Sequence, residues 1–278
     1  MKTLSRLALA AALSLSVCLP TTAQPLLKLA PPQSLFREAV TLAQFTRGTL
    51  RFVLLHELGH GFVDVYELPV LGREEDAADR FAIFWLSPDG AGEDGLDAVG
   101  AMEWWMASAK MNPTARADLP WWDEHGMDEQ RAFQIACLLY GRAPDDFGPL
   151  AGRVGIPQDR RDSCRFEAAQ NSLSWGKLLK ANVSNLHSLD SFFTTLTYEP
   201  ASPSTADAAA LAKRLGLLEE VREILRQMRW AEGQETIRIV ARDCKVANAF
   251  WSPARNELTL CYELVNQVVE VGVAAGFR

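Results

Sequence analysis

Two histidines and a glutamate stand in the sequence at a spacing that suits zinc chemistry. The segment His56-Glu57-Leu58-Gly59-His60 has the pattern HExxH and lies in a stretch whose apolar residues recur with a helical period. Residues four apart lie on one face of a helix, so both imidazoles can reach one ion. Glu57 adjoins the first histidine and would point to the open coordination position, where a carboxylate takes a proton from bound water.

A catalytic zinc needs a third protein ligand, and an acidic stretch at residues 74–79 follows the two histidines. On a helix, Glu75 and Asp79 share one face because they are four residues apart. We predict Glu75 as the third ligand of one zinc ion per chain and Asp79 as the residue that orients a ligand histidine, with Glu74 as the competing ligand. The alternative is a solvated acidic first turn, which is favourable at a helix N-terminus.

The motifs resemble those of a bacterial family of metallopeptidases of unknown substrate. The resemblance rests on HELGH, on the sequence LPVLGREEDAADRFA at residues 68–82, and on an Asp-x-His-x-x-x-x-Gln-Arg element that leads into a Cys and Tyr-Gly. In this chain the last element runs from Asp123 to Arg131, followed by Cys137 and Tyr140-Gly141. These motifs extend over most of the chain.

The chain is also similar to the zincin peptidases that include the membrane CaaX prenyl endopeptidases. There HExxH is followed by a ligand Glu with an Asp four residues later, and farther on by a His with an Arg six residues later. Glu75 and Asp79 match the first spacing, and His125 and Arg131 match the second. The resemblance implies that His125 stabilises the oxyanion and that Arg131 supports a carboxylate of the site. An imidazole N–H aimed at the tetrahedral oxygen suits that role, although a lone histidine is more often a surface residue.

The first residues have the order of a secretory signal. Residues 1–6 carry two positive charges, residues 7–19 are apolar, and residues 21–23 are small. The apolar run is shorter than the ~20 residues that cross a bilayer, so a membrane anchor is the weaker alternative, as is lipid attachment at Cys18. We predict a signal peptide at residues 1–23, export to the periplasm or beyond, and no stable membrane insertion after cleavage.

Four cysteines follow this signal, namely Cys137, Cys164, Cys244 and Cys261. An even number in an exported chain predicts two disulfides, and the absence of a Cys-x-x-Cys pair disfavours a cysteine zinc site. Pairing neighbours in sequence joins Cys137 to Cys164 and Cys244 to Cys261. The second pair flanks a predicted hairpin, where cross-strand partners come close.

Helical periodicity dominates the chain, and segments with strand character appear only near the C-terminus. We predict a helix at 34–68 that is interrupted near Gly48, further helices at 73–86, 96–110, 127–140, 162–181, 206–228 and 263–274, and strands at 188–198, 236–240 and 257–262. A turn at 252–256 predicts a hairpin of the last two strands. The fold class is α+β, mostly helical and zincin-like, with a small sheet or hairpin near the C-terminus.

We expect residues 24–200 to form a zincin-like catalytic region and residues 201–278 to add a helix–hairpin–helix element to the same domain. About seventy residues would make a thin core alone. The segment 244–263 resembles an element that precedes HExxH in family members, so either the order is permuted within one domain or the end of the chain forms a separate unit. If the order is permuted, the closing helix should end near the opening helix around residues 35–45.

The predicted reaction is hydrolysis of a peptide bond by zinc-activated water, with Glu57 as general base. A formal net charge of −7 argues against nucleic acid as a partner, so we expect a peptide or protein substrate. One alternative is a non-catalytic binding protein with a structural zinc, although such sites are usually closed by four protein ligands. Another is a zinc amidase or esterase, because activated water does not by itself select the acyl substrate.

Overall fold

The computed structural model describes residues 40–87, 92–111, 118–119, 121–180, 194–228 and 236–278. Contacts divide the chain into residues 1–31 and residues 32–278, and every described residue belongs to the second unit. The predicted signal peptide at residues 1–23, Cys18 included, lies outside the described residues.

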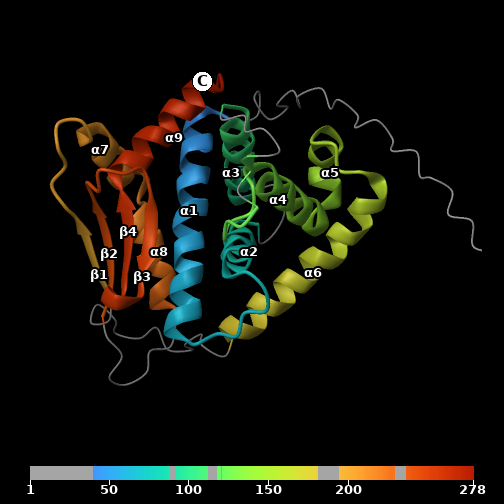
Figure 1. Ribbon diagram of the computed structural model, residues 1–278, viewed down its shortest axis with the longest axis horizontal. Helices are drawn as coiled ribbons and strands as arrows, with labels where there is room; N and C mark the ends of the chain where they lie inside the picture. The colour runs from blue at the N-terminus through green and yellow to red at the C-terminus, as the bar shows by residue number, and fades with distance from the viewer. Residues whose placement is uncertain (1–39, 88–91, 112–117, 120, 181–193, 229–235) are drawn as a thin grey trace, which may run out of the picture. The chain divides into compact units, whose positions relative to one another are not determined.

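Helix α1 (Leu42–Val65) carries the HExxH segment and is central to this unit. It contacts α2 and α3 on one side and β3, β4 and α9 on the other (Figure 1). Thr41 caps it with a reciprocal pair of hydrogen bonds to Gln44. The predicted interruption near Gly48 is wrong, because the helix is continuous there. A Cβ atom on Gly48 would lie 2.2 Å from the carbonyl oxygen of Asp97, so the glycine permits close contact with α3.

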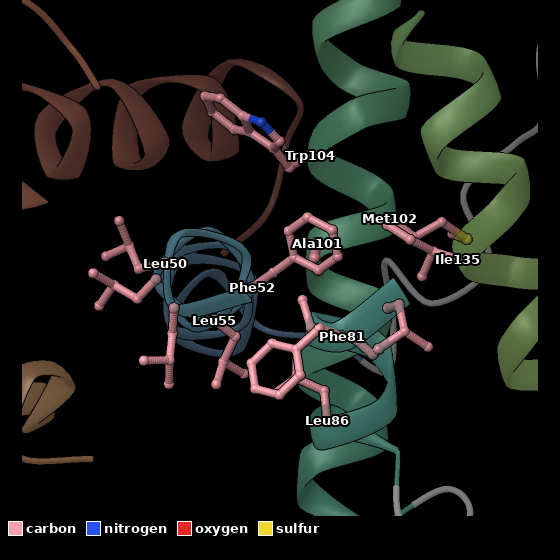
Figure 2. Close-up of a cluster of buried hydrophobic side chains, with 14 of the residues drawn as sticks. Leu50, Phe52, Leu55, Phe81, Leu86, Ala101, Met102, Trp104 and Ile135 are labelled. Atoms are coloured by element: carbon pink, nitrogen blue, oxygen red, sulfur yellow. The ribbon is translucent and has the colours of Figure 1, made fainter. Parts of the chain in front are cut away.

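Further helices pack in succession beside α1: α2 (Glu74–Leu86), α3 (Glu93–Met111), α4 (Asp128–Arg142), α5 (Pro144–Arg153) and α6 (Gln158–Lys180). Helices α2 and α3 contact α1, α4 contacts α3, and α5 and α6 contact α4. Figure 2 shows the core between the first of these helices, where Phe52 of α1, Phe81 of α2 and Met102 of α3 are buried. Helix α5 was absent from the prediction, because Gly148 and Pro149 lie inside it.

A four-stranded sheet lies on the other side of α1, in the order β1-β2-β4-β3. Its strands are β1 (Thr194–Tyr198), β2 (Ile237–Arg242), β3 (Ala249–Ser252) and β4 (Glu257–Cys261). Strands β1, β2 and β4 are parallel neighbours, and β3 pairs antiparallel with β4. The α+β, mostly helical fold class is confirmed. The predicted pairing of residues 236–240 with 257–262 as a hairpin is wrong, because β4 forms its hairpin with the unpredicted strand β3.

The segment predicted as one helix at 206–228 consists of α7 (Ala206–Leu215) and α8 (Leu217–Arg226). Gly216 separates them with a φ of 65°, a left-handed conformation that glycine adopts without a steric cost. Helix α8 packs on β1 and β2, and α7 packs on α9.

Helix α9 (Tyr262–Ala274) brings the end of the chain to the beginning of α1. The backbone N–H of Leu42 donates to the carbonyl oxygen of Arg278 over 2.9 Å. The ring of Phe277 stacks on Phe45 with centroids 4.5 Å apart. Strand β1 precedes residue 200 and pairs with β2, so one sheet joins segments from both sides of that position.

Both predicted cysteine pairs, Cys137–Cys164 and Cys244–Cys261, are disulfides in the structure. The first joins α4 to α6, and the second joins the segment after β2 to the end of β4. In the described part of the chain, no helix combines the length and the apolar character needed to cross a membrane.

Candidate metal centre

Three side-chain atoms converge between α1 and α2. Nε2 of His56 and Nε2 of His60 are 3.2 Å apart, and Oε2 of Glu75 lies 3.1 Å from the first and 3.4 Å from the second. Ligand atoms about 2.0–2.1 Å from a tetrahedral zinc ion are roughly 3.3–3.4 Å from one another. The triangle of nitrogen, nitrogen and oxygen therefore has the size of one face of such a coordination sphere.

The donor set fits a divalent ion on a second ground. Oε2 of Glu75 is buried and, within the described residues, forms no hydrogen bond of acceptable geometry. Three imidazole nitrogens nevertheless surround it, from His56, His60 and His125. A cation shared by these atoms would satisfy the buried oxygen, and two imidazoles with one carboxylate are ligands that zinc accepts.

Carboxylates fix the orientation of both imidazoles. Nδ1 of His56 lies 2.8 Å from Oδ1 of Asp79, and Nδ1 of His60 lies 2.7 Å from Oε1 of Glu74. In each ring Nδ1–H donates to the carboxylate, which leaves the lone pair of Nε2 for an ion. Glu74, predicted as a competing ligand, thus contacts the far nitrogen of His60.

Arg131 holds the carboxylate behind His56. Its Nε and Nη2 donate to the two oxygens of Asp79 over 2.8 and 2.5 Å, and both side chains are buried. The guanidinium also lies over the ring of Trp105, with Cζ 3.7 Å from the centroid. The chain of contacts from Trp105 through Arg131 and Asp79 to His56 fixes one corner of the triangle.

The same carboxylates determine how the histidines titrate. Burial lowers the pKa of His56, but the hydrogen bond to Asp79 and the close carboxylate of Glu75 outweigh burial and raise it to about 9. The pKa of His60 is raised against burial in the same way. Burial raises the pKa of Glu75, but the close imidazole of His125 and those of His56 and His60 hold it far below its ordinary value. A metal ion competes with the protons on these imidazoles, so its affinity should increase with pH.

Glu57 lies beside the triangle and contacts the sheet. Its Oε2 accepts a hydrogen bond from the backbone N–H of Trp251 in β3 over 2.8 Å. Burial raises the pKa of Glu57, although the neighbouring histidines and this N–H act in the opposite direction. A half-buried carboxylate whose pKa is raised above its ordinary value is suited to proton transfer.

His125 lies on the loop before α4, at the rim of the site. Its Nε2 is 2.8 Å from Oε2 of Glu75, and its ring stacks on that of His56 with centroids 6.1 Å apart. Asp123 supports the loop by accepting the backbone N–H of His125 over 2.8 Å. Donor atoms of His56, Glu75 and His125 lie within 4.8 Å of one another, so His125 is also within reach of an ion held by the other two.

The triangle opens into a cleft of about 650 Å³. The cleft is lined by residues of α1, α2, the His125 loop and the segment that contains β3: His56, Glu57, His60, Val63, Asp64, Glu74, Glu75, His125, Asn248, Ala249, Phe250, Trp251 and Pro253. All the residues predicted as ligands or catalytic groups are among them, and Asp79 and Arg131 lie behind.

Sequence reasoning missed the wall of the cleft that β3 forms. Trp251 contacts both Glu57 and Asp64, the latter through an indole N–H that donates to Oδ2 over 3.0 Å. The signal that could have identified it was the resemblance of residues 244–263 to an element that precedes HExxH in family members.

The family described as "Putative metallopeptidase" matches residues 30–179 and 198–277. The chain belongs to this family. The match thus includes the segments that carry the metal centre and those that form the sheet, and the class that it defines is a metal-dependent peptidase. No curated protein and no solved structure matches the chain.

Proposed function

We propose that this protein is an exported zinc metallopeptidase in which Glu57 is the general base. The observation that carries the proposal is the triangle of His56 Nε2, His60 Nε2 and Glu75 Oε2 beside the half-buried Glu57 carboxylate. Three protein ligands leave one coordination position open, which is typical of catalytic rather than structural zinc.

When bound, zinc would supply Lewis acidity that makes water nucleophilic at neutral pH and polarises a carbonyl group. Glu57 would take a proton from the attacking water and deliver it to the leaving amine, because its carboxylate lines the cleft beside the triangle. His125 would donate its N–H to the oxygen that becomes negative in the transition state. Asp79 and Arg131 would hold His56 in place.

The edge of the sheet supports a peptide as the substrate. Within the described residues β3 pairs with β4 alone, so its other edge faces the cleft. The carbonyl oxygen of Asn248 accepts from Cys261 of β4, whereas the N–H of Trp251 points to Glu57. The N–H of Trp251 therefore points away from β4, and an extended peptide could add as a strand on this side of β3, which lines the cleft. A small amide or ester would not use this edge.

A second candidate function is a non-catalytic protein with a closed zinc site. The observation in its favour is His125, whose Nε2 lies 2.8 Å from Oε2 of Glu75 and would complete four protein ligands. Against it, His125 is half exposed at the rim of the cleft, and the Glu57 carboxylate that lines the cleft has no part in a structural site.

Export is supported by the two disulfides, which form and persist in oxidising compartments. We place the processed protein in the periplasm or outside the cell.

The test is cleavage of a peptide library by residues 24–278 with one equivalent of zinc. We expect hydrolysis that a chelator abolishes and zinc restores. Glu57→Gln should keep the zinc and lose hydrolysis by about 10²–10⁴-fold. A zinc-loaded wild-type protein that cleaves no member of the library would exclude the peptidase and leave the closed site or the zinc amidase or esterase as the explanation.

A further inference from the structure

Asp64 lines the cleft at a distance from the metal centre and is held by a neutral partner. It lies on α1 four residues beyond His60, which places it about 6 Å farther along the helix axis, and its side chain is exposed. Oδ2 accepts the indole N–H of Trp251 over 3.0 Å. Within the described residues, no lysine or arginine lines this cleft.

Apolar surface leads from the metal centre to Asp64. Val63, Trp251 and Pro253 line the same cleft. The ring of Trp251 packs against α1 at Gly61, where a Cβ atom would lie 3.2–3.4 Å from three ring atoms. One edge of the indole is thus fixed by the helix backbone and the other by Asp64. This wall suits a long side chain with a methylene stem and a charged end.

The charges of the site make that end a cation. Glu57 and Glu75 together balance a divalent ion, and Asp79 is paired with Arg131. Asp64 adds a negative charge on the wall of the cleft that none of these groups compensates. The other exposed carboxylate, that of Glu74, is directed at His60.

We propose that Asp64 binds the charged end of a lysine or arginine side chain of the substrate, with the stem of that side chain on Val63 and Trp251. An extended peptide advances about 3.3 Å per residue, so the basic residue lies within about two positions of the bond that is cut. The proposal rests on the peptidase function and names the class of peptide that it selects.

The experiment uses quenched fluorescent peptides that are acetylated and amidated at their ends. One position carries Lys, norleucine or Glu, and the others carry a mixture of neutral residues. The enzymes are wild type, Asp64→Asn, and Glu270→Gln as a control that removes one exposed charge on α9. An exposed ion pair gives a preference of up to about fivefold, so wild type and control should prefer Lys over norleucine by that factor, with Glu cleaved most slowly.

Asp64→Asn should bring the ratio of Lys to norleucine in kcat/KM close to one, because the amide oxygen still accepts the indole N–H but carries no charge. An unchanged ratio in this variant would overturn the proposal and leave Asp64 as a support for Trp251. Faster cleavage of peptides that have a free amino terminus and no lysine would assign Asp64 to that amine and overturn the side-chain assignment.

A binding measurement separates this proposal from the peptidase function. Calorimetry of zinc-loaded Glu57→Gln with the Lys and norleucine peptides should give the same preference, and it should weaken at high salt. If wild type cleaves nothing but this preference persists, the peptidase function fails and recognition by Asp64 stands. If wild type cleaves peptides without regard to lysine, only the role of Asp64 fails.

Discussion

The backbone N–H of Trp251 donates a hydrogen bond to the carboxylate of Glu57 over 2.8 Å, although the two residues are 194 positions apart in sequence. This bond joins the edge strand of the sheet to the helix that carries the two histidines. It orients one oxygen of the proposed base and leaves the other free to face the cleft.

Glu57→Asp tests whether the position of the carboxylate affects the rate of hydrolysis. Shortening the side chain by one methylene withdraws the carboxylate from the N–H of Trp251, and a misplacement of about 1 Å can cost on the order of 10²-fold in rate. We expect kcat to fall by that factor while the zinc content stays at one per chain. Wild-type kcat in Glu57→Asp would show that the contact with Trp251 has no part in positioning the base.

The ligand set is tested by comparing His60→Ala with His125→Ala. His60→Ala should lose the metal, because Nε2 of His60 is one corner of the triangle. His125→Ala should keep the metal and lose about 10²-fold in kcat, as expected for one oxyanion donor. Elemental analysis after dialysis and the zinc-dependent rise in Tm measure the difference. Equal loss of zinc in both variants would make His125 a ligand and favour the closed site.

The contact between Asp79 and His56 should contribute to metal affinity. Asp79→Asn should weaken zinc binding by about 10–100-fold, measured by competition with a chromophoric chelator. Arg131→Met leaves the buried Asp79 carboxylate without its cation and should cost on the order of 3 kcal/mol in stability. The double variant Asp79→Asn/Arg131→Met removes both the negative and the positive charge, so it should be more stable than Arg131→Met alone. Strict additivity would contradict the pairing.

The local part of the site could be predicted from the sequence. The spacings from His56 to His60 and from Glu75 to Asp79 are helical, and helical geometry fixes which side chains share a face. The structure brings these four side chains together as expected. Each cysteine is also bonded to the cysteine nearest to it in sequence, because the segments that carry the two members of a pair are neighbours in the fold.

The rest depends on contacts between distant segments. Gly48 suggested an interruption of the helix. In the structure a glycine is needed there because the carbonyl oxygen of Asp97 in α3 leaves no room for a side chain. Strand β3 has four residues, too few for a clear alternating pattern. It is β3, and not the predicted strand at 236–240, that forms the hairpin with β4. Its position beside α1 makes Trp251 part of the site, and no local spacing encodes that contact.

Stability should depend on pH through Glu257, which is buried among Arg238, Arg242 and Arg255. Burial raises the pKa of Glu257, but the charge and hydrogen bond of Arg242 and the hydroxyl of Thr259 outweigh it and hold the pKa below its ordinary value. A depressed pKa in the folded state stabilises above the pKa of the unfolded chain, and this contribution is lost as pH falls through the folded value.

Glu257→Gln should therefore lose on the order of 1–3 kcal/mol at pH 7. The difference from wild type should shrink below about pH 4, where the unfolded chain begins to take up its proton. Urea unfolding between pH 3 and 8 measures this difference in the free energy of unfolding, with Glu270→Gln as an exposed control. A difference that does not vary with pH would mean that packing, rather than charge, is what the substitution removes.

The segment from residue 201 to the C-terminus should be inseparable from the catalytic region. Truncation after Pro200 removes β2, β3, β4 and α9. It exposes Phe45, which loses the stacked ring of Phe277, and takes Trp251 from Glu57. We expect a fragment without a cooperative unfolding transition and without hydrolysis.

A circular permutant of residues 41–278 provides the matched control for this truncation. It begins at residue 201, ends at residue 200, and joins residue 278 to residue 41 by a short Gly-Ser linker. The N–H of Leu42 already bonds to the carbonyl oxygen of Arg278, so the linker has little distance to span, and permutation is tolerated when chain ends lie close. The permutant should unfold cooperatively, bind zinc and retain activity, because every strand and helix of the site is present. A truncated fragment that folds and cleaves as well as the permutant would establish the C-terminal part as an independent module.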